Sequence, residues 1–151
     1  FKESFRFVLP GYNVRPLEME GAIGIEQLKK LPGLIIERRK NSEKFKELLQ
    51  DHPHLMIQKE IGSSSWFGFS LIIRKESHFT RKELINKLYS LGFESRPIVT
   101  GNFASNEVVK YFDYDIKFKL ENAEYISANG LFIGNQNFPM TNAFELIGQI
   151  R

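Results

Sequence analysis

The sequence predicts one small domain of the α/β class, built as an α+β layer in which a small, mostly antiparallel sheet is covered by helices. The chain has 151 residues, which corresponds to about one domain of roughly 100–200 residues. Its hydrophobic content of 42% and charged content of 26% are ordinary for a globular protein. Helical patterns lie at both ends of the chain and between the strand patterns, an order that favours α+β architecture.

The first part of the chain predicts two helices after an irregular start. Residues 1–15 show no helical periodicity. Pro16 suits the first position of a helix, and small and apolar residues at steps of three and four predict that helix over 17–31. Pro32-Gly33 is expected to break or kink it. A second helix is predicted over 34–50.

Four short segments predict strands. Alternating apolar and polar residues over 55–59 and an apolar run over 66–73 lie on either side of a turn at Gly62. These two strands are expected to pair as a hairpin. Two further short strands are predicted over 93–99 and 131–134, and a proline inside the former keeps it from a central, fully paired position.

Clear start and stop signals mark the later helices. Thr80 and Glu83 form the pattern of a capping box, so a helix is predicted from there to about Leu91, with a glycine closing it. Three more helices are predicted over 107–112, over 119–129, and from Thr141, which is expected to cap a helix that is still running at the last residue.

Composition excludes several kinds of function. No apolar run approaches the roughly 20 residues that a membrane span needs, and no signal or transit peptide is recognisable, so we expect a cytoplasmic protein without a membrane partner. The absence of cysteine excludes disulfides and thiolate chemistry. The net charge of +3 is spread among acidic neighbours, which argues against a nucleic-acid partner. A start at Phe1 suggests a piece of something longer.

Metal binding is not expected either. The three histidines are not spaced as a metal-binding pair on one helix face, and they are interpreted as surface or turn residues: His52, His54 and His78. The densest basic run, 38–40, is interspersed with glutamates and is expected to be a solvated helix face rather than an anion-binding patch.

Two polar clusters stand out as candidate sites. The first places the amide of Asn13 and the guanidinium of Arg15 just before a predicted helix, where an anion is favoured. An ordinary helix start is the alternative, and spacing alone slightly favours it. The second contains Glu94 and Arg96, which share a face if they lie on a strand. They could bind hydroxyl or phosphate groups, or form an exposed ion pair of little energy.

Several strings identify a resemblance. GYNVRPLEMEGAIGIEQLKKLPG resembles the start of the C-terminal portion of the DegT/DnrJ/EryC1/StrS family, whose members are sugar-nucleotide aminotransferases and dehydratases. SSSWFGFSLIIRKE, ESRPIVTGNF, VVKYFDYD and NAEYISANGLFIGN resemble its branch of 3-dehydratases. The resemblance runs over about 5–139. It implies the C-terminal small domain of a fold-type I aminotransferase over 16–151, with 1–15 as the linker from a large domain.

The resemblance also implies a function for the longer parent. That parent would be a lyase that removes the 3-hydroxyl of a GDP-4-keto-6-deoxyhexose in colitose-type deoxysugar and O-antigen synthesis. Its cofactor would be pyridoxal 5′-phosphate, converted to pyridoxamine 5′-phosphate at the expense of glutamate, and it would be a homodimer. The catalytic Lys or His would lie upstream, so no catalytic residue is expected in this segment, which alone would be inactive.

Residue by residue, the resemblance implies two kinds of contact. Asn13 would reach across the dimer to the cofactor phosphate of the other subunit. Substrate contacts would come from Phe5, Arg15, Glu94, Arg96 and Asn102. For the last two, shaping the loop is the alternative.

Two other functions remain open at the level of sequence. One is a sugar-nucleotide 4-aminotransferase of the same family, of the perosamine-synthase type, which an upstream Lys instead of His would distinguish. The other is a binding domain without catalysis, which only the mild basic charge and the start at Phe1 favour.

Overall fold

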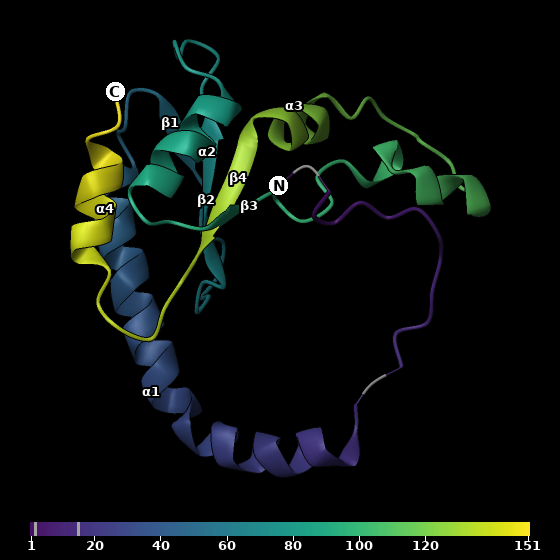
Figure 1. Ribbon diagram of the computed structural model, residues 1–151, viewed down its shortest axis with the longest axis horizontal. Coiled ribbons are helices and arrows are strands. Elements are labelled where there is room, and N and C mark those ends of the chain that lie inside the picture. Colours follow the sequence, from purple (N-terminus) through teal and green to yellow (C-terminus); the bar gives the residue numbers. More distant parts are fainter. Residues whose placement is uncertain (2, 15) are drawn as a thin grey trace.

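A four-stranded antiparallel sheet forms the centre of the computed structural model, which describes residues 1, 3–14 and 16–151 (Figure 1). The strand order is β1-β2-β4-β3. The strands are β1 (Leu55–Ile57), β2 (Gly68–Ile73), β3 (Ser95–Arg96) and β4 (Gly130–Gly134). The fold class predicted from the sequence is therefore confirmed, and so is the hairpin across Gly62, because β1 pairs antiparallel with β2.

One face of the sheet carries the hydrophobic core. Phe69 pairs with Ile133 and Leu71 with Leu131 across β2 and β4, and all four side chains are buried. Helices α1 (Glu18–Leu49), α2 (Arg81–Ser90) and α4 (Thr141–Gly148) add their apolar sides to this core. The aromatic centre is Phe45 of α1, whose ring centroid lies 4.5 Å from that of Phe69. Helix α3 (Glu121–Asn129) contacts β2 and β4 and buries none of its side chains completely.

Helix α1 differs from the sequence prediction, which placed two separate helices on either side of Pro32-Gly33. The structure has one helix of 32 residues that runs through Pro32. Figure 1 shows the ribbon changing direction between its purple and blue portions. A proline removes one backbone donor and crowds the preceding turn, so a bend is the alternative to a break. The buried residues of α1 all lie in its second half, from Asn41 onward.

The helices predicted from Thr80 to about Leu91 and over 119–129 are found as α2 and α3, with bounds that differ by at most two residues. The capping box at Thr80 is present, since its Oγ1 accepts from the backbone N–H of Glu83 at 3.3 Å. The segment predicted as a helix over 107–112 is a short 3₁₀ helix, Glu107–Tyr111, which follows another at Phe103–Ser105.

The last helix corrects two expectations. Thr141 is the first helical residue of α4 and does not cap it. Instead Met140 is the N-cap residue, and its N–H, which like that of any N-cap has no acceptor within the helix, donates to Asn41 Oδ1 at 3.0 Å. The helix ends at Gly148, before the last residue of the chain; glycine is a poor helix former.

Within the described residues, none of the helices has the length and apolar character that crossing a membrane requires.

Candidate functional site

Glu94 and Arg96 lie together at the edge of the sheet. Arg96 belongs to β3, the short outer strand, and pairs there with Phe132 of β4. Its Nε and Nη2 donate to Glu94 Oε1 at 3.2 and 3.1 Å. The expectation that these two side chains share a face is confirmed. Both are exposed, with side-chain exposed fractions of 78% for Glu94 and 56% for Arg96, so the pair contributes little to folding stability and stands open to a ligand.

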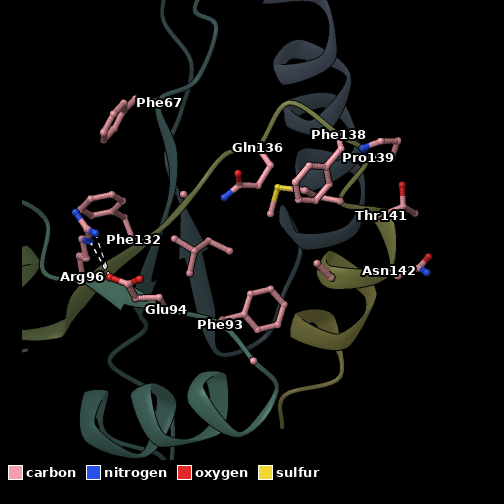
Figure 2. Close-up of a pocket in the computed structure, with 15 residues that line it drawn as sticks. Phe67, Phe93, Glu94, Arg96, Phe132, Gln136, Phe138, Pro139, Thr141 and Asn142 are labelled. Carbon is pink, nitrogen blue, oxygen red and sulfur yellow. Dashed lines mark hydrogen bonds and ion pairs between the residues drawn. The ribbon is translucent and has the colours of Figure 1, made fainter. Parts of the chain in front are cut away.

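This ion pair borders a cavity of about 740 Å³ (Figure 2). The cavity is formed by the start of β2, the α2–β3 connection, β4, the loop 135–140 and the start of α4. Figure 2 shows the ion pair beside Phe132, with Phe93 and Gln136 further along the wall. Four phenylalanine rings line it: Phe67, Phe93, Phe132 and Phe138. Aromatic walls beside a few polar groups are typical of small-molecule sites.

Most of this wall is not predicted from the sequence. Phe67 and Phe132 fall in segments predicted only as strands, and Phe138 lies in none of the predicted elements. The sequence signal for these positions is weak. A Phe that follows a Trp at the start of a predicted strand fits a core position as well as it fits the wall of a cavity. Only the pairing of β2 with β4 and β4 with β3 brings these rings to the ion pair.

Phe5 lies near Glu94 and Arg96, in a second cavity at β3. A cavity of about 400 Å³ is lined by Phe5 together with Phe93, Glu94 and Arg96. The structure therefore brings three of the sequence-predicted substrate residues, Phe5, Glu94 and Arg96, to one place. A further cavity of about 390 Å³ joins Phe5 to Asn102.

The place of Phe5 is held by contacts of the irregular N-terminal segment with the 3₁₀ helices. The N–H of Val108 donates to the carbonyl of Phe7 at 3.1 Å, and Arg6 forms an ion pair with Glu107 at 2.5 Å. The hydrogen bond from Arg6 lowers the pKa of the Glu107 carboxyl and the hydrogen bond to Glu107 raises the pKa of Arg6. These contacts join residues about 100 positions apart, which no local pattern indicates.

Asn102 is buried and serves the loop in which it lies. Its Oδ1 accepts from the N–H of Ala104 at 3.2 Å, and its carbonyl accepts from the N–H of Ser105 at 3.0 Å. These bonds make it the cap of the 3₁₀ helix Phe103–Ser105. A direct substrate contact by Asn102 stays a prediction.

Asn13 lies apart from this group. It is exposed, as are its neighbours Tyr12 and Val14, and the purple trace of 8–14 runs away from the sheet (Figure 1). Arg15 lies outside the described residues. At the start of α1 the chain supplies a carboxylate of its own, since Glu20 Oε2 accepts from the N–H of Leu17 at 3.0 Å. This arrangement favours an ordinary helix start over an anion site made by α1 itself.

Left-handed backbone surrounds the cavities. Three described residues other than glycine have positive φ: Phe5 at 61°, Trp66 at 50° and Val99 at 43°. Such backbone is costly for bulky or β-branched residues and gathers at functional sites. Phe5 and Val99 line the cavity that contains Asn102, and Trp66 precedes Phe67, which lines the cavity beside Glu94 and Arg96.

One of the three histidines lies elsewhere than the sequence predicted. His52 was expected at the surface or in a turn, but it is buried, and its Nδ1 accepts from the N–H groups of His54 and Leu55 at 3.1 Å each. Burial lowers the pKa of the His52 imidazole. Among the described residues, no three His, Cys, Asp or Glu side chains are grouped to hold a metal ion.

Comparison with known families identifies the class of protein. The sequence profile of the DegT/DnrJ/EryC1/StrS aminotransferase family matches residues 1–142, and the chain belongs to this family. The resemblance seen in the sequence strings is therefore confirmed.

Within the family, the chain is similar to GDP-4-keto-6-deoxy-D-mannose 3-dehydratase. It is 57% identical to the protein of Escherichia coli O55:H7, covering 99% of this chain and 39% of that protein. It is 61% identical to that of Yersinia pseudotuberculosis, covering 96% and 37%. The chain thus spans less than two fifths of the length of these relatives.

Solved structures agree. The E. coli enzyme with bound hydrated PLP superposes with a TM-score of 0.84 at 57% identity, over 98% of this chain and 38% of that one. The sugar aminotransferase CalS13 of Micromonospora echinospora superposes with a TM-score of 0.70 at 14% identity, over 92% of this chain and 36% of that one, which shows a shared fold.

Proposed function

We propose that this chain is the C-terminal small domain, over 16–151, of a pyridoxal-phosphate-dependent GDP-4-keto-6-deoxy-D-mannose 3-dehydratase, with 1–15 as the linker from a large domain. The observation that carries the proposal is an identity of 57–61% over nearly the whole chain to dehydratases of which it spans only 37–39%. The complete polypeptide acts as a cytoplasmic homodimer in deoxysugar synthesis for lipopolysaccharide O-antigen, and the segment alone is inactive.

The cofactor contact proposed for this chain is the amide of Asn13. An exposed amide on an extended segment suits a contact to a phosphate on another subunit, because its Nδ2 can donate to a phosphate oxygen. When bound, the cofactor supplies the electron sink for loss of the 3-hydroxyl. One amide donor does not hold a cofactor by itself, so the remaining contacts belong to the large domain.

The substrate contact proposed for this chain centres on Glu94. Both guanidinium contacts of Arg96 go to Oε1 of Glu94, so among the described residues Oε2 is left to accept from a sugar hydroxyl. Phe5 offers its ring from the adjoining cavity. The role of Arg15 as a substrate contact is carried by the family resemblance, and its guanidinium suits a phosphate oxygen of the nucleotide.

Substitution of Glu94 in the complete polypeptide tests the proposal. Glu94→Gln removes the charged acceptor and is expected to slow the reaction with the GDP-sugar by roughly ten- to a hundredfold, the effect of about 1.5–3 kcal/mol for a hydrogen bond to a charged group. Conversion of the cofactor by glutamate, which carries no sugar, should proceed at the unmodified rate. Stopped-flow absorbance of the cofactor measures the two half-reactions separately.

A matched control is Glu47→Gln, which removes the partner of Lys44 in an exposed ion pair on α1 at 2.7 Å. It should leave both half-reactions unchanged. Equal slowing of both half-reactions by Glu94→Gln would assign this residue to structure alone. Analysis of the product separates the 3-deoxysugar of a dehydratase from the amino sugar of a 4-aminotransferase.

A further inference from the structure

Two asparagine side chains join the walls of the cavity beside Glu94 and Arg96 to helix α1. Asn41 of α1 is buried, and Asn135 lies just after β4. Asn41 Nδ2 donates to Asn135 Oδ1 at 3.1 Å. Because an amide group both donates and accepts, each asparagine can link to the other and to the backbone at the same time.

Asn135 holds the first wall, which is the turn before β2. Its Nδ2 donates to the carbonyls of Arg38 and Trp66 at 3.0 Å each, and its N–H donates to the carbonyl of Phe67 at 3.3 Å. The Trp66 carbonyl also accepts from Arg38 Nη2 at 2.6 Å. Trp66 has a φ of 50°. The hydrogen bonds to its carbonyl therefore stabilise a strained backbone and offset the conformational cost of that strain.

Asn41 holds the second wall, which is the loop 135–140. Its Nδ2 also donates to the carbonyls of Gln136 and Phe138 at 3.2 and 2.8 Å, and its Oδ1 accepts from the N–H of Met140 at 3.0 Å. Figure 2 shows Phe67 on one side of the cavity and Gln136 and Phe138 on another. The two walls thus depend on one pair of amides.

We infer that Asn135 and Asn41 are positioning residues that hold the Trp66–Phe67 turn and the loop 135–140 in the shape that accepts the GDP-sugar beside Glu94 and Arg96. The substrate side of this inference rests on the proposed function. Neither asparagine lines the cavity, so both act through the residues that do. When the walls are already ordered before the substrate binds, the binding free energy is not reduced by the entropy cost of ordering them.

The test is Asn135→Asp in the complete polypeptide, which keeps an oxygen acceptor and removes the Nδ2 donor. Amide hydrogen exchange should accelerate at least tenfold over 66–67 and 135–140 and remain unchanged in β1. The KM for the GDP-sugar should rise about tenfold while kcat stays within about twofold. Asn41→Asp, which removes donors to the second wall, should act in the same direction, and it serves if the first variant does not fold.

A matched control is Asn129→Asp, the same change on α3, where Nδ2 donates to the carbonyl of Tyr125 at 3.1 Å. It should alter neither KM nor exchange at the two walls. The double variant of Asn41 and Asn135 should raise KM by less than the product of the single effects, since residues in one hydrogen-bond network are not additive.

The outcomes separate the two proposals. Unchanged exchange at both walls, or a KM equal to that of the unmodified protein, would overturn the positioning role. Loss of kcat with an unchanged KM would do the same. Absence of turnover by the unmodified polypeptide would overturn the proposed function instead, while the exchange data would still decide whether the two asparagines hold the walls.

Discussion

His52 shows how surroundings change the role of a single residue. The imidazole is buried and Nδ1 accepts two backbone N–H groups, so the neutral ring is the form that fits. Burial is the main cause that lowers its pKa; the backbone of Ile150 acts in the opposite direction, and electrostatic repulsion from His54, Arg74 and Arg151 lowers the pKa further. Since the folded pKa lies below the unfolded value of about 6.5, the stability due to His52 is complete above pH 6.5 and falls as the pH drops below it.

We therefore predict an acid-sensitive free energy of unfolding. Between pH 7.5 and 5.5 the free energy of unfolding of the 151-residue chain should fall through protonation of this group in the unfolded state. His52→Asn keeps an acceptor near the place of Nδ1 but does not titrate, so it should flatten the dependence, whereas His78→Asn should retain it. Urea unfolding at the two pH values measures this. An equal loss in the His52 and His78 variants would show that other groups are responsible.

Asn13 carries the second prediction at this scale. In the complete polypeptide, Asn13→Ala should weaken retention of pyridoxal phosphate by about 1.5–3 kcal/mol, the effect of one hydrogen bond to a charged group, without dissociating the dimer. Equilibrium dialysis gives the affinity and sedimentation gives the assembly. Asn122→Ala, an exposed asparagine on α3, is the control. Unchanged affinity with an intact dimer would remove the phosphate contact from the proposal.

Secondary-structure elements differ in how much their own sequence supports them. Helix α2 is stabilised at its start by three bonds between Thr80 and Glu83, and Glu83 Oε2 accepts from both the N–H and the hydroxyl of Thr80, at 2.7 and 2.8 Å. The backbone hydrogen bond from Thr80 lowers the pKa of Glu83. Helix α4 has no such side-chain cap among the described residues, and its start is held by Asn41 from another element.

This contrast gives a prediction for two threonines. Thr80→Ala should lower the free energy of unfolding by about 1 kcal/mol, the usual cost of losing an N-cap, and Thr80→Ser should restore most of it. Thr141→Ala should cost less, because Thr141 lies inside the helix. Thermal or urea unfolding of the three variants measures the order. A larger loss for Thr141 would contradict the assignment of the caps.

The molecule as a whole exposes much apolar surface away from its core. Ile23, Ile25 and Leu28 on the first half of α1 are each more than half exposed, and no Cβ placed at Gly21 or Gly24 meets any described atom within 4 Å. The segment after the second 3₁₀ helix adds Tyr114, Ile116 and Phe118. Exposed apolar side chains on these two segments favour association.

Accordingly, the isolated 151-residue chain should associate in a concentration-dependent manner, which sedimentation velocity detects. Leu28→Glu should weaken association, since it places a charge in the apolar part of α1. Leu146→Glu, an exposed position on α4, should have a smaller effect. A chain that stays monomeric at all concentrations, or equal effects of both substitutions, would refute the role of α1.

The sequence by itself determined the features that short-range chemistry controls. The capping box at Thr80, the hairpin across Gly62 and the shared face of Glu94 and Arg96 depend on residues close together in the chain, and all three are found. The family strings identified the class of protein for a similar reason, because they are read directly from neighbouring residues.

Only the tertiary structure decided what depends on distant pairing. The place of β4 between β2 and β3, the burial of His52, the aromatic cavity and the links of Asn41 to the loop 135–140 join residues far apart in sequence. Helix α1 continues through Pro32 although local chemistry allowed either a break or a bend. Local patterns indicate only the propensity of a segment for a helix, strand or turn. These features instead arise when packed elements form hydrogen bonds with each other and bury each other's apolar side chains.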